Sequence, residues 1–552
     1  MHFAPLGDSA VVVTWPELAA EDRSGAVVGL SERLNRARLP GVMAVVPAFA
    51  SVTVFYDPLG LNHKRVNPFA TIGAMIAEHA VAVGVAVELE SGRVVELPVR
   101  YGGEDGPDLV AVAAHAGLSE DEVIARHSAA GYRVEAIGFT PGFPYLSGLP
   151  PELAMPRRST PRAKVPAGTV GIGGRQAGVY PLESPGGWQL IGRTDAMLFD
   201  AAKAEPAMLR VGDRVKFRVA SAASKAKDAG RVCHPLDDKP LEGGGAGLRV
   251  VSAGMFTTVQ DLGRPGQRAA GVPSGGATDA IAARIANLLV GNAESEAGLE
   301  LTMIGPEIEF LSDGLIALGG AEFAGCAAWQ PVRVTAGQRI KFGAALSGCR
   351  GFLAIAGGLD VPPELGSRST YARAGIGGWA GRALQAGDEL PVNAKSRAVG
   401  TRWWLDRRIL PEYGPAPMLR VLAGAQAEEF DGAWCDQEWK VTPQSDRMGM
   451  RLAGVALKRT GGRELLSSAV APGTVQVPPD GQPIVLLADA QTIGGYPQLA
   501  NVINVDLPLL AQVRPGGVVR FKPVSLEDAH QLWWAREHAI GLLREGLAAK
   551  IH

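Results

Sequence analysis

The residues best suited to bind a small polar molecule occur in four glycine- and proline-rich stretches, the first of which runs from Gly138 to Leu146. Two prolines and two glycines favour a stiff loop whose backbone N–H groups stay in place as donors. Such a loop can wall a pocket for a small polar ligand, and a packed turn is the alternative. The residues predicted to contact substrate here are Gly138, Phe139, Thr140, Gly142, Phe143 and Tyr145.

The second stretch, from Pro156 to Gly168, contains four cations within eight residues. Arginine presents a planar pair of donors and lysine a point charge, and both suit phosphate groups. Prolines on both sides favour a fixed anion cradle, whereas a solvated basic face is the ordinary alternative for a charge run. We predict phosphate contacts from Arg162 and Lys164.

The third stretch joins residues 257–266 to residues 273–279, where a Ser-Gly-Gly turn precedes an apolar helix pattern. The unpaired N–H groups of a helix N-terminus form a natural anion site, so Ser274 is predicted to contact phosphate. An amide, a carboxylate and a cation also occur within five positions, which combines a hydrogen-bonding group, a base and a positive charge. The predicted catalytic residues of this stretch are Gln260, Asp261 and Arg264.

The fourth site combines residues 445–449 with residues 491–497. Polar side chains beside glycines let the backbone approach a ligand closely, and a tight turn is the alternative. We predict a phosphate contact from Arg447 and substrate contacts from Gly494, Gly495 and Tyr496.

His127 is a candidate proton carrier because an imidazole exchanges protons near neutral pH. Ser119 and Glu122 predict a capping box that begins a helix, and this helix places Val123 and His127 on one face. The chain then continues into the loop at Gly138, which brings the imidazole toward the predicted pocket. A buried core imidazole is the alternative.

Common catalytic signatures are absent from the sequence. It has no G-x-x-x-x-G-K-S/T phosphate loop, no G-x-S-x-G elbow, no H-E-x-x-H pair and no dinucleotide-binding glycine motif before a helix. It also lacks the glycine- and serine-rich stretch of amidase-signature enzymes, which counts against an ordinary amidase. The four cysteines are far apart, so neither a zinc site nor a disulfide framework is predicted.

Composition narrows the class of protein. The 71 glycines and 39 prolines among 552 residues favour turns over long helices, and a hydrophobic content of 47% predicts a globular chain. A net charge of −2 without a basic stripe argues against nucleic-acid binding. Because no secretory signal opens the sequence and no apolar run is long enough for a membrane span, we expect a cytoplasmic protein.

Residues 1–100 alternate between apolar runs and helical patterns in the order β-α-β-β-α-β. The helical patterns cover residues 22–39 and 70–83, and the last strand covers Val94–Val99. This order is the split βαβ arrangement, which predicts a ferredoxin-like α+β subdomain over residues 1–90.

An internal repeat connects the two halves of the chain. Residues 166–170 correspond to residues 471–475, Gly186-Gly187-Trp188 to Gly494-Gly495-Tyr496, and residues 211–217 to residues 515–521. The constant order and similar spacing predict related β-rich units, with convergent hairpin chemistry as the alternative. Between the halves, residues 221–247 have the composition of a linker.

Together these motifs resemble two families. Residues 1–220 are similar to the KipI family, the PxpB component of ATP-dependent 5-oxoprolinase, and residues 248–530 are similar to the KipA family, its PxpC component. The first resemblance is carried by residues 5–8, 101–103, 138–146, 161–162 and 184–188, and the second by residues 258–264, 445–449, 476–483 and 494–497. Here the two are fused through the linker.

The resemblance implies a mainly β fold with α+β parts. It places a cyclophilin-like β-barrel over residues 91–220 and a carboxyltransferase-type domain of two β-rich subdomains over residues 248–400 and 401–552, so that each half contains such a barrel. It also implies relatedness to the carboxyltransferase domain of urea carboxylase and to chains called allophanate hydrolase subunits 1 and 2.

The activity implied by the resemblance is the hydrolysis of 5-oxo-L-proline to glutamate, coupled to ATP with Mg²⁺, together with a PxpA (LamB-type) partner protein. In this interpretation Arg162, Lys164 and Arg264 neutralise the phosphates, and Asp261 or His127 handles the proton. The loop at Gly138 holds the lactam ring. The sequence leaves homo-oligomerisation open, and no protein-bound metal site is predicted.

Two alternatives remain. A biotin-dependent carboxyltransferase component acting on a urea-like amide would need biotin on another chain, because this sequence contains no Met-Lys-Met attachment site. A KipI-type regulator of a histidine kinase would bind its partner without performing chemistry.

Overall fold

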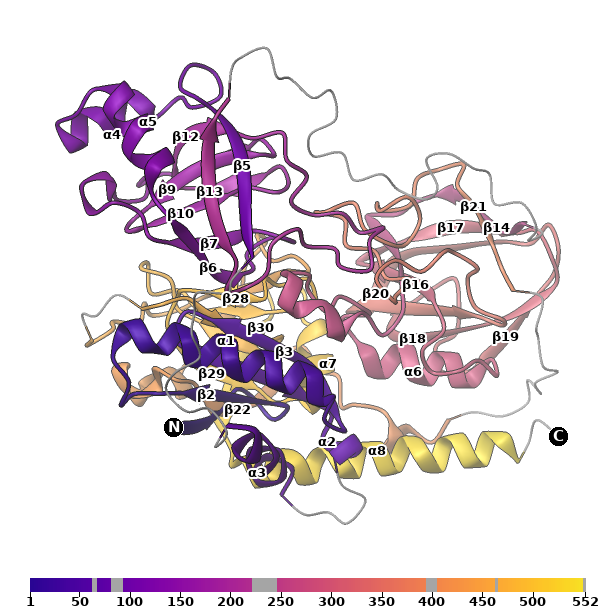
Figure 1. The fold of residues 1–552 in the computed structure, drawn as a ribbon. Coiled ribbons are helices and arrows are strands. Elements are labelled where there is room, and N and C mark those ends of the chain that lie inside the picture. The colour runs from indigo at the N-terminus through magenta and orange to yellow at the C-terminus, as the bar shows by residue number, and fades with distance from the viewer. Residues whose placement is uncertain (62–66, 81–92, 221–245, 394–404, 462–464, 550–552) are drawn as a thin grey trace.

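A computed structural model of the chain describes residues 1–61, 67–80, 93–220, 246–393, 405–461 and 465–549. Figure 1 shows a small N-terminal unit, two β-barrels and a third β-rich unit, with a long C-terminal helix along one side. Within the described residues, no helix combines the length and the apolar character needed to cross a membrane. The predicted linker at 221–247 falls almost entirely outside the described residues.

The N-terminal unit is an antiparallel sheet in the order β1-β2-β4-β3, covered by helices. Val27, Leu30 and Leu34 recur at helical spacing and form the buried stripe that packs on the sheet. The elements are β1 (His2–Pro5), β2 (Ala10–Thr14), α1 (Ala20–Ala37), β3 (Val42–Ala48), β4 (Ser51–Tyr56), α2 (Pro58–Leu61) and α3 (Pro68–Ala80).

The strand predicted to complete this sheet belongs to a different unit. Strand β5 (Val94–Tyr101) pairs in parallel with β13 (Arg214–Val219) and forms part of the first barrel. The edge position beside β2 is occupied by β1 instead. The prediction was wrong on this point because an alternating pattern identifies the inward face of a strand but not the strand it pairs with.

The first barrel closes in the order β10-β7-β6-β13-β5-β12-β9. Two helices cover it, and the capping box predicted at Ser119 and Glu122 is confirmed at the start of α5. A two-stranded sheet of β8 and β11 lies beside the barrel. The remaining elements are α4 (Leu109–Ala116), α5 (Glu120–Ala129), β6 (Tyr132–Ile137), β7 (Pro144–Ser147), η2 (Pro151–Leu153), β8 (Arg162–Val165), β9 (Thr169–Gly173), β10 (Gln176–Val179), β11 (Ser184–Gly186) and β12 (Gln189–Arg193).

The third unit is an open sheet in the order β15-β16-β20-β17-β14-β21, extended by β18 and β19. Its core is formed by inward-facing aliphatic and aromatic residues of these strands. The elements are β14 (Ala246–Ser252), β15 (Phe256–Gln260), η3 (Pro265–Ala270), α6 (Ala280–Leu289), β16 (Gly298–Thr302), β17 (Ile304–Phe310), β18 (Gly314–Phe323), β19 (Pro331–Val334), β20 (Arg339–Ile355) and β21 (Glu389–Pro391).

The second barrel closes in the order β22-β29-β26-β27-β24-β23-β30, with a two-stranded sheet of β25 and β28 beside it. The elements are η4 (Arg407–Ile409), β22 (Met418–Ala423), η5 (Ala427–Glu429), η6 (Gly432–Cys435), β23 (Trp439–Val441), β24 (Gly449–Ala453), β25 (Ser468–Ala469), β26 (Thr474–Gln476), β27 (Ile484–Leu486), β28 (Ile493–Gly494), β29 (Gln498–Val502), η7 (Asn504–Asp506), α7 (Leu507–Ala511), β30 (Val518–Pro523) and α8 (Leu526–Ala548).

The two barrels have the same strand order, which confirms the repeat found in the sequence. In each, the first strand is parallel to the last: β5 to β13 and β22 to β30. The repeated turn contains a glycine with positive φ in both copies, at Gly168 and Gly473. Each glycine faces a backbone carbonyl so closely that a Cβ would collide with it. The predicted mainly β fold with barrels in both halves is therefore confirmed.

Candidate active site between the two barrels

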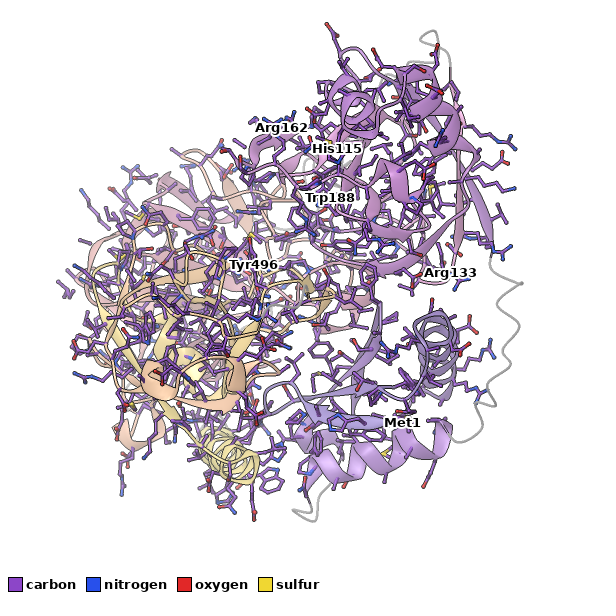
Figure 2. All side chains as sticks on the ribbon, turned by 90° about the vertical axis from the view of Figure 1, so that its left-hand side faces the viewer. Met1, His115, Arg133, Arg162, Trp188 and Tyr496 are labelled. Atoms are coloured by element: carbon purple, nitrogen blue, oxygen red, sulfur yellow. The ribbon has the colours of Figure 1, made fainter. Side chains whose placement is uncertain are left out.

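A cavity of about 1100 Å³ lies between the two barrels. The first barrel unit contributes Phe139, Tyr145 and the segments 154–157 and 173–176. The second contributes residues that include Asp446, Arg451, Gln476 and Gln491, and the third unit contributes Arg373. Trp188 of the first barrel and Tyr496 of the second both lie near the junction of the halves (Figure 2). The cavity is therefore built jointly by segments more than 300 residues apart in sequence.

One wall of the cavity is aromatic. Phe139 and Tyr145 each pack edge-to-face on the buried Phe143, with ring centroids 5.5 Å and 5.0 Å apart. Phe139 has a φ of 68°, in the left-handed region that a bulky side chain seldom adopts. A Cβ on Gly138 would collide with Ile493, so this loop packs directly on β28 of the second barrel.

Another part of the cavity lining is polar. Gln491 Nε2 donates to Gln476 Oε1 at 3.3 Å, which leaves the buried Nε2 of Gln476 without an acceptor among the described residues. In the first barrel, the buried Oε1 of Gln176 likewise has no donor within the described part of the chain. Unpaired buried amides are costly, and a bound polar ligand would satisfy them.

The charges around the cavity are mostly positive. Four arginines line it, namely Arg157, Arg175, Arg373 and Arg451, together with one carboxylate, Asp446. Arg373 lies 3.7 Å from Asp446, whose side chain is 53% exposed, while no ion pair of the other three is found in the described residues. Asp446 also accepts from the backbone N–H groups of Met448 and Gly449, which fix its direction. This excess of positive charge favours an anionic ligand.

Arg447 does not line this cavity, contrary to its predicted phosphate contact. It is buried and donates to Asp489 in a two-point contact, to Glu300 and to the Thr278 hydroxyl. Burial lowers the pKa of Arg447, but the two carboxylates outweigh this effect and raise it. Its charge is already neutralised, so Arg447 joins the third unit to the second barrel.

Gln260, Asp261 and Arg264 do lie together, but they hold a loop and do not line the cavity. Asp261 accepts from the Ser367 hydroxyl at 2.6 Å and from the Arg368 N–H at 2.6 Å. The predicted catalytic roles are not supported, because hydrogen bonds within the protein occupy the Asp261 carboxylate. Gln260 Nε2 donates to the Thr370 carbonyl, and Arg264 donates to the Ser369 carbonyl. The loop held in this way leads to Arg373, so these residues position a cavity arginine.

His127 belongs to the core of the first barrel unit. Its side chain is fully buried, stacks on Phe217 with ring centroids 4.7 Å apart, and has Nδ1 2.8 Å from the Tyr101 hydroxyl. Burial lowers the pKa of His127 to about 3, so the imidazole stays neutral. It does not line the cavity, and the core alternative explains its position.

The predicted phosphate residues are scattered. Arg162 donates to Asp108 at 2.8 Å, and Lys164 forms an exposed ion pair with Glu183 at 3.0 Å. Ser274 accepts from Arg268 at a second, separate cavity. None of the three lines the site between the barrels. The cavity is lined instead by Arg157, from the same basic stretch, and by Arg175, Arg373 and Arg451, which the sequence did not single out.

The substrate contacts predicted from the two glycine loops divide into two groups. Phe139, Tyr145, Gly494, Gly495 and Tyr496 line the cavity. The others lie behind this surface and support it: Gly142 N–H donates to the Ala270 carbonyl, and Phe143 is buried. Gly138 and Thr140 approach Gly271 through their backbones.

Several cavity residues were not predicted from the sequence. Asp446 and Gln476 occur within the glycine- and proline-containing motifs at residues 445–449 and 476–483, so these motifs were a usable signal for them. Arg373 is followed by the closely spaced glycines 375, 377 and 378, all with positive φ, which is a sequence signal for a ligand loop. The sequence around Arg175 contains no motif that would have indicated a ligand site. No group of three metal-ligating side chains occurs among the described residues.

Comparison with known proteins identifies the class. The carboxyltransferase domain model for subdomains A and B matches residues 270–523, and that for subdomains C and D matches residues 1–209. The crystal structure of TTHA0988 superposes with a TM-score of 0.80 at 36% identity, covering 93% of this chain and 99% of that one. The Kluyveromyces lactis urea carboxylase gives a TM-score of 0.51 at 29% identity, covering 56% of this chain and 30% of that one.

Curated relatives match each half separately. The C subunit of 5-oxoprolinase from Escherichia coli is 45% identical over 301 residues, which are 51% of this chain and 93% of that protein. The B subunit of 5-oxoprolinase from Bacillus subtilis is 43% identical over 220 residues, 38% of this chain and 90% of that protein. The chain belongs to the carboxyltransferase-domain family. Within that family it is a fused KipI–KipA-type protein, with a KipI-like half followed by a KipA-like half.

Proposed function

We propose that the chain is a fused PxpB–PxpC component of an ATP-dependent 5-oxoprolinase. The observation that supports this most strongly is the cavity between the barrels, because residues from both halves line it. In the relatives named as B and C subunits of 5-oxoprolinase, these halves are separate proteins. A site that exists only where the two halves meet would require both of them.

The proposed reaction couples an unfavourable ring opening to ATP. The lactam oxygen attacks the γ-phosphorus, the bond to the ADP oxygen breaks, and the lactam N–H proton leaves to a base. A first water adds to the activated carbon and the C–N bond breaks, which leaves an acyl phosphate and a free amine. A second water releases phosphate and completes the γ-carboxylate of glutamate. Such transfer depends mainly on positioning and on neutralising charge.

The cavity offers a residue for each task in the first step. Arg157, Arg175 and Arg451 can face the phosphates, since none is engaged in an ion pair within the described residues. Asp446 is the carboxylate of the cavity and is proposed to accept the lactam proton. Gln476 can donate to the substrate through its free Nε2, and the aromatic wall can pack against the flat lactam ring.

Magnesium would enter the cavity together with the nucleotide. The cavity is lined by a single carboxylate, which is too few for a protein-based magnesium site, so the ATP phosphates would bind the ion. The sequence has no Met-Lys-Met site for biotin. A PxpA (LamB-type) protein is proposed as the partner that completes turnover.

The test is release of phosphate that depends on 5-oxoproline. The purified chain, mixed with a LamB-type partner, ATP and Mg²⁺, should release phosphate only when 5-oxo-L-proline is present. Gln476→Leu should reduce that rate about 100-fold while the protein stays folded, because a buried hydrogen bond to the substrate is lost. Equal phosphate release with and without the lactam would overturn the proposal.

A second candidate is favoured by one observation. Urea amidolyase of Lachancea kluyveri is 33% identical over 360 residues, which are 58% of this chain and 19% of that protein. The same cavity could therefore serve a carboxyl transfer to a urea-like amide from biotin on a partner chain. Incorporation of labelled bicarbonate into the amide, dependent on a biotinylated partner, distinguishes this candidate from lactam hydrolysis.

A further inference from the structure

A second cavity, of about 300 Å³, shares no lining residue with the proposed active site. Ser9, Met43 and Phe55 come from the KipI-like half, whereas the other lining residues come from the KipA-like half. The residues of the KipA-like half include members of η3, the start of α6, the 471–472 turn, α7 and α8. The cavity therefore lies at the contact between the two halves.

A buried guanidinium faces this cavity without a counter-ion. Arg268 is 2% exposed and lines the cavity, with its guanidinium over the Phe55 ring at 4.3 Å. It donates to the Ser274 hydroxyl at 3.1 Å and to the Val470 carbonyl, and its Nε has no acceptor within the described residues. No carboxylate pairs with it there, and burial lowers its pKa to about 10. An uncompensated buried charge is expensive, so an anion would relieve a real cost.

The other charged groups of the cavity leave this site positive. Arg284 forms a two-point ion pair with Glu537, so that pair contributes little net charge. Arg536 donates to the Ile409 carbonyl at 2.8 Å. Arg536 also lies within electrostatic reach of the Asp279 and Asp506 carboxylates. Arg268 is therefore the lining cation for which no carboxylate partner is found among the described residues.

The start of helix α6 provides further donors. Asp279 accepts from the Ala282 N–H through its side chain and from the Ala283 N–H through its carbonyl. The N–H groups of Ala280 and Ile281 have no intrahelical acceptor, and both residues line the cavity. These donors and the helix dipole favour a negative group here.

The remaining lining is apolar. Met43, Phe55, Leu262, Leu487 and Trp533 surround the polar end. This combination suits a ligand with one charged group and an apolar body. A phosphate, with at least three acceptor oxygens and up to two charges, would need more donors than the unpaired Nε of Arg268 and two backbone N–H groups supply.

We propose that this cavity binds a small monocarboxylate with an apolar body, held by Arg268 at the junction of the two halves. The ligand contacts both halves at once, so binding stabilises their docking. The site is independent of the lactam chemistry proposed above and is defined by different residues. A ligand that binds only the folded chain stabilises it by an amount that grows with the ratio of ligand concentration to Kd. The melting temperature of the chain should therefore rise as ligand is added.

The test is calorimetric titration of the full chain with benzoate, benzamide and inorganic phosphate. Benzoate should bind with one site per chain, and benzamide, which has the same shape without the charge, at least about tenfold more weakly. Arg268→Gln should reduce benzoate affinity to the level of benzamide. Equal binding of benzoate and benzamide, or binding of phosphate in preference to benzoate, would overturn the proposal.

A second variant covers the case in which Arg268→Gln fails to fold. Ala280 is exposed at the start of α6, so Ala280→Met extends into the cavity without disturbing the core. It should abolish benzoate binding while the melting temperature without ligand stays unchanged. Ala125→Met, at an exposed position of α5, is the matched control and should bind benzoate normally. Unchanged benzoate affinity in Ala280→Met would place the ligand elsewhere and contradict the assignment.

Discussion

The two barrels follow the same strand order but differ where they meet the cavity between them. Trp188 of the first barrel is 6% exposed, whereas Tyr496, its counterpart in the repeat, is 45% exposed. A Cβ at Gly173 would lie 2.6 Å from the Trp188 ring and one at Gly178 would lie 2.9 Å from it, so glycines make room for the indole. The first barrel is therefore sealed by an aromatic cluster, while the second leaves its aromatic residue at the cavity.

The residue that follows the repeated Thr-Val pair is also small in the first barrel and polar in the second. It is Gly171 in the first barrel and Gln476 in the second. A Cβ on Gly171 would lie 3.2 Å from the Trp188 Cβ, which leaves no room for a longer side chain, whereas Gln476 faces the cavity. One scaffold used twice thus supplies an aromatic wall from one copy and a polar wall from the other.

The largest effect that tests this difference is on stability. Trp188→Ala should lower the free energy of unfolding by about 3–5 kcal/mol, because it removes a large buried side chain. Tyr496→Ala should cost less than about 1 kcal/mol, because the ring is half exposed. Chemical denaturation of both variants measures the contrast. Similar losses in the two variants would show that the barrels do not differ in this way.

The next effect is on catalysis at the polar wall. Asp446→Asn should reduce lactam-dependent phosphate release about 100-fold by removing the proposed proton acceptor, with little change in stability. The amide oxygen can still accept from Met448 and Gly449. Asp480→Asn is the matched control, since Asp480 accepts from Gln482 in a similar turn of the same barrel. Full activity in Asp446→Asn would remove the carboxylate from the proposed mechanism.

A smaller effect concerns the pH dependence of stability. A buried carboxyl group, that of Asp8, joins the N-terminal unit to the second barrel, and its protonation changes on unfolding. Asp8 accepts from the Asn504 N–H at 3.0 Å, and burial raises its pKa to about 6. A raised carboxyl pKa means that the folded state holds the proton more tightly. Its stabilising contribution is complete below the unfolded value near 4 and is lost as the pH rises through 6.

Asp8→Asn should therefore make unfolding less dependent on pH between about 4 and 7, because the amide does not titrate in this range. Burial also raises the pKa of Asp279 to about 6. Part of the pH dependence of unfolding should therefore remain in this variant. Melting temperatures across this pH range measure the change. An unaltered pH profile in Asp8→Asn would contradict the assignment to Asp8.

Much of this architecture could be predicted from local sequence. The repeated turn predicted two related barrels because its glycine must adopt positive φ in both copies, and the capping box at Ser119 is encoded within four residues. The pairing of β5 could not be predicted, because a strand's pattern does not identify its neighbour. Long-range pairing is therefore where the fold prediction failed.

The candidate site could be predicted only in part, for a similar reason. Gln260, Asp261 and Arg264 were correctly grouped, but their partners lie about 100 residues away in the loop before Arg373. A polar cluster looks the same in sequence whether it binds a ligand or another loop. The burial of His127 depends on Phe217, far along the chain, and a helix pattern alone does not reveal it.

The central claim is that both barrels bind one anionic substrate in the cavity between them. The direct measurement is calorimetric titration of a non-hydrolysable ATP analogue, with Mg²⁺ and 5-oxoproline, into Arg175→Ala from the first barrel and Arg451→Ala from the second. Each should raise Kd about tenfold by removing a charge-assisted contact, whereas Lys164→Ala, outside the cavity, should bind as the parent does. Loss of affinity in only one barrel's variant, or in Lys164→Ala, would contradict a shared site.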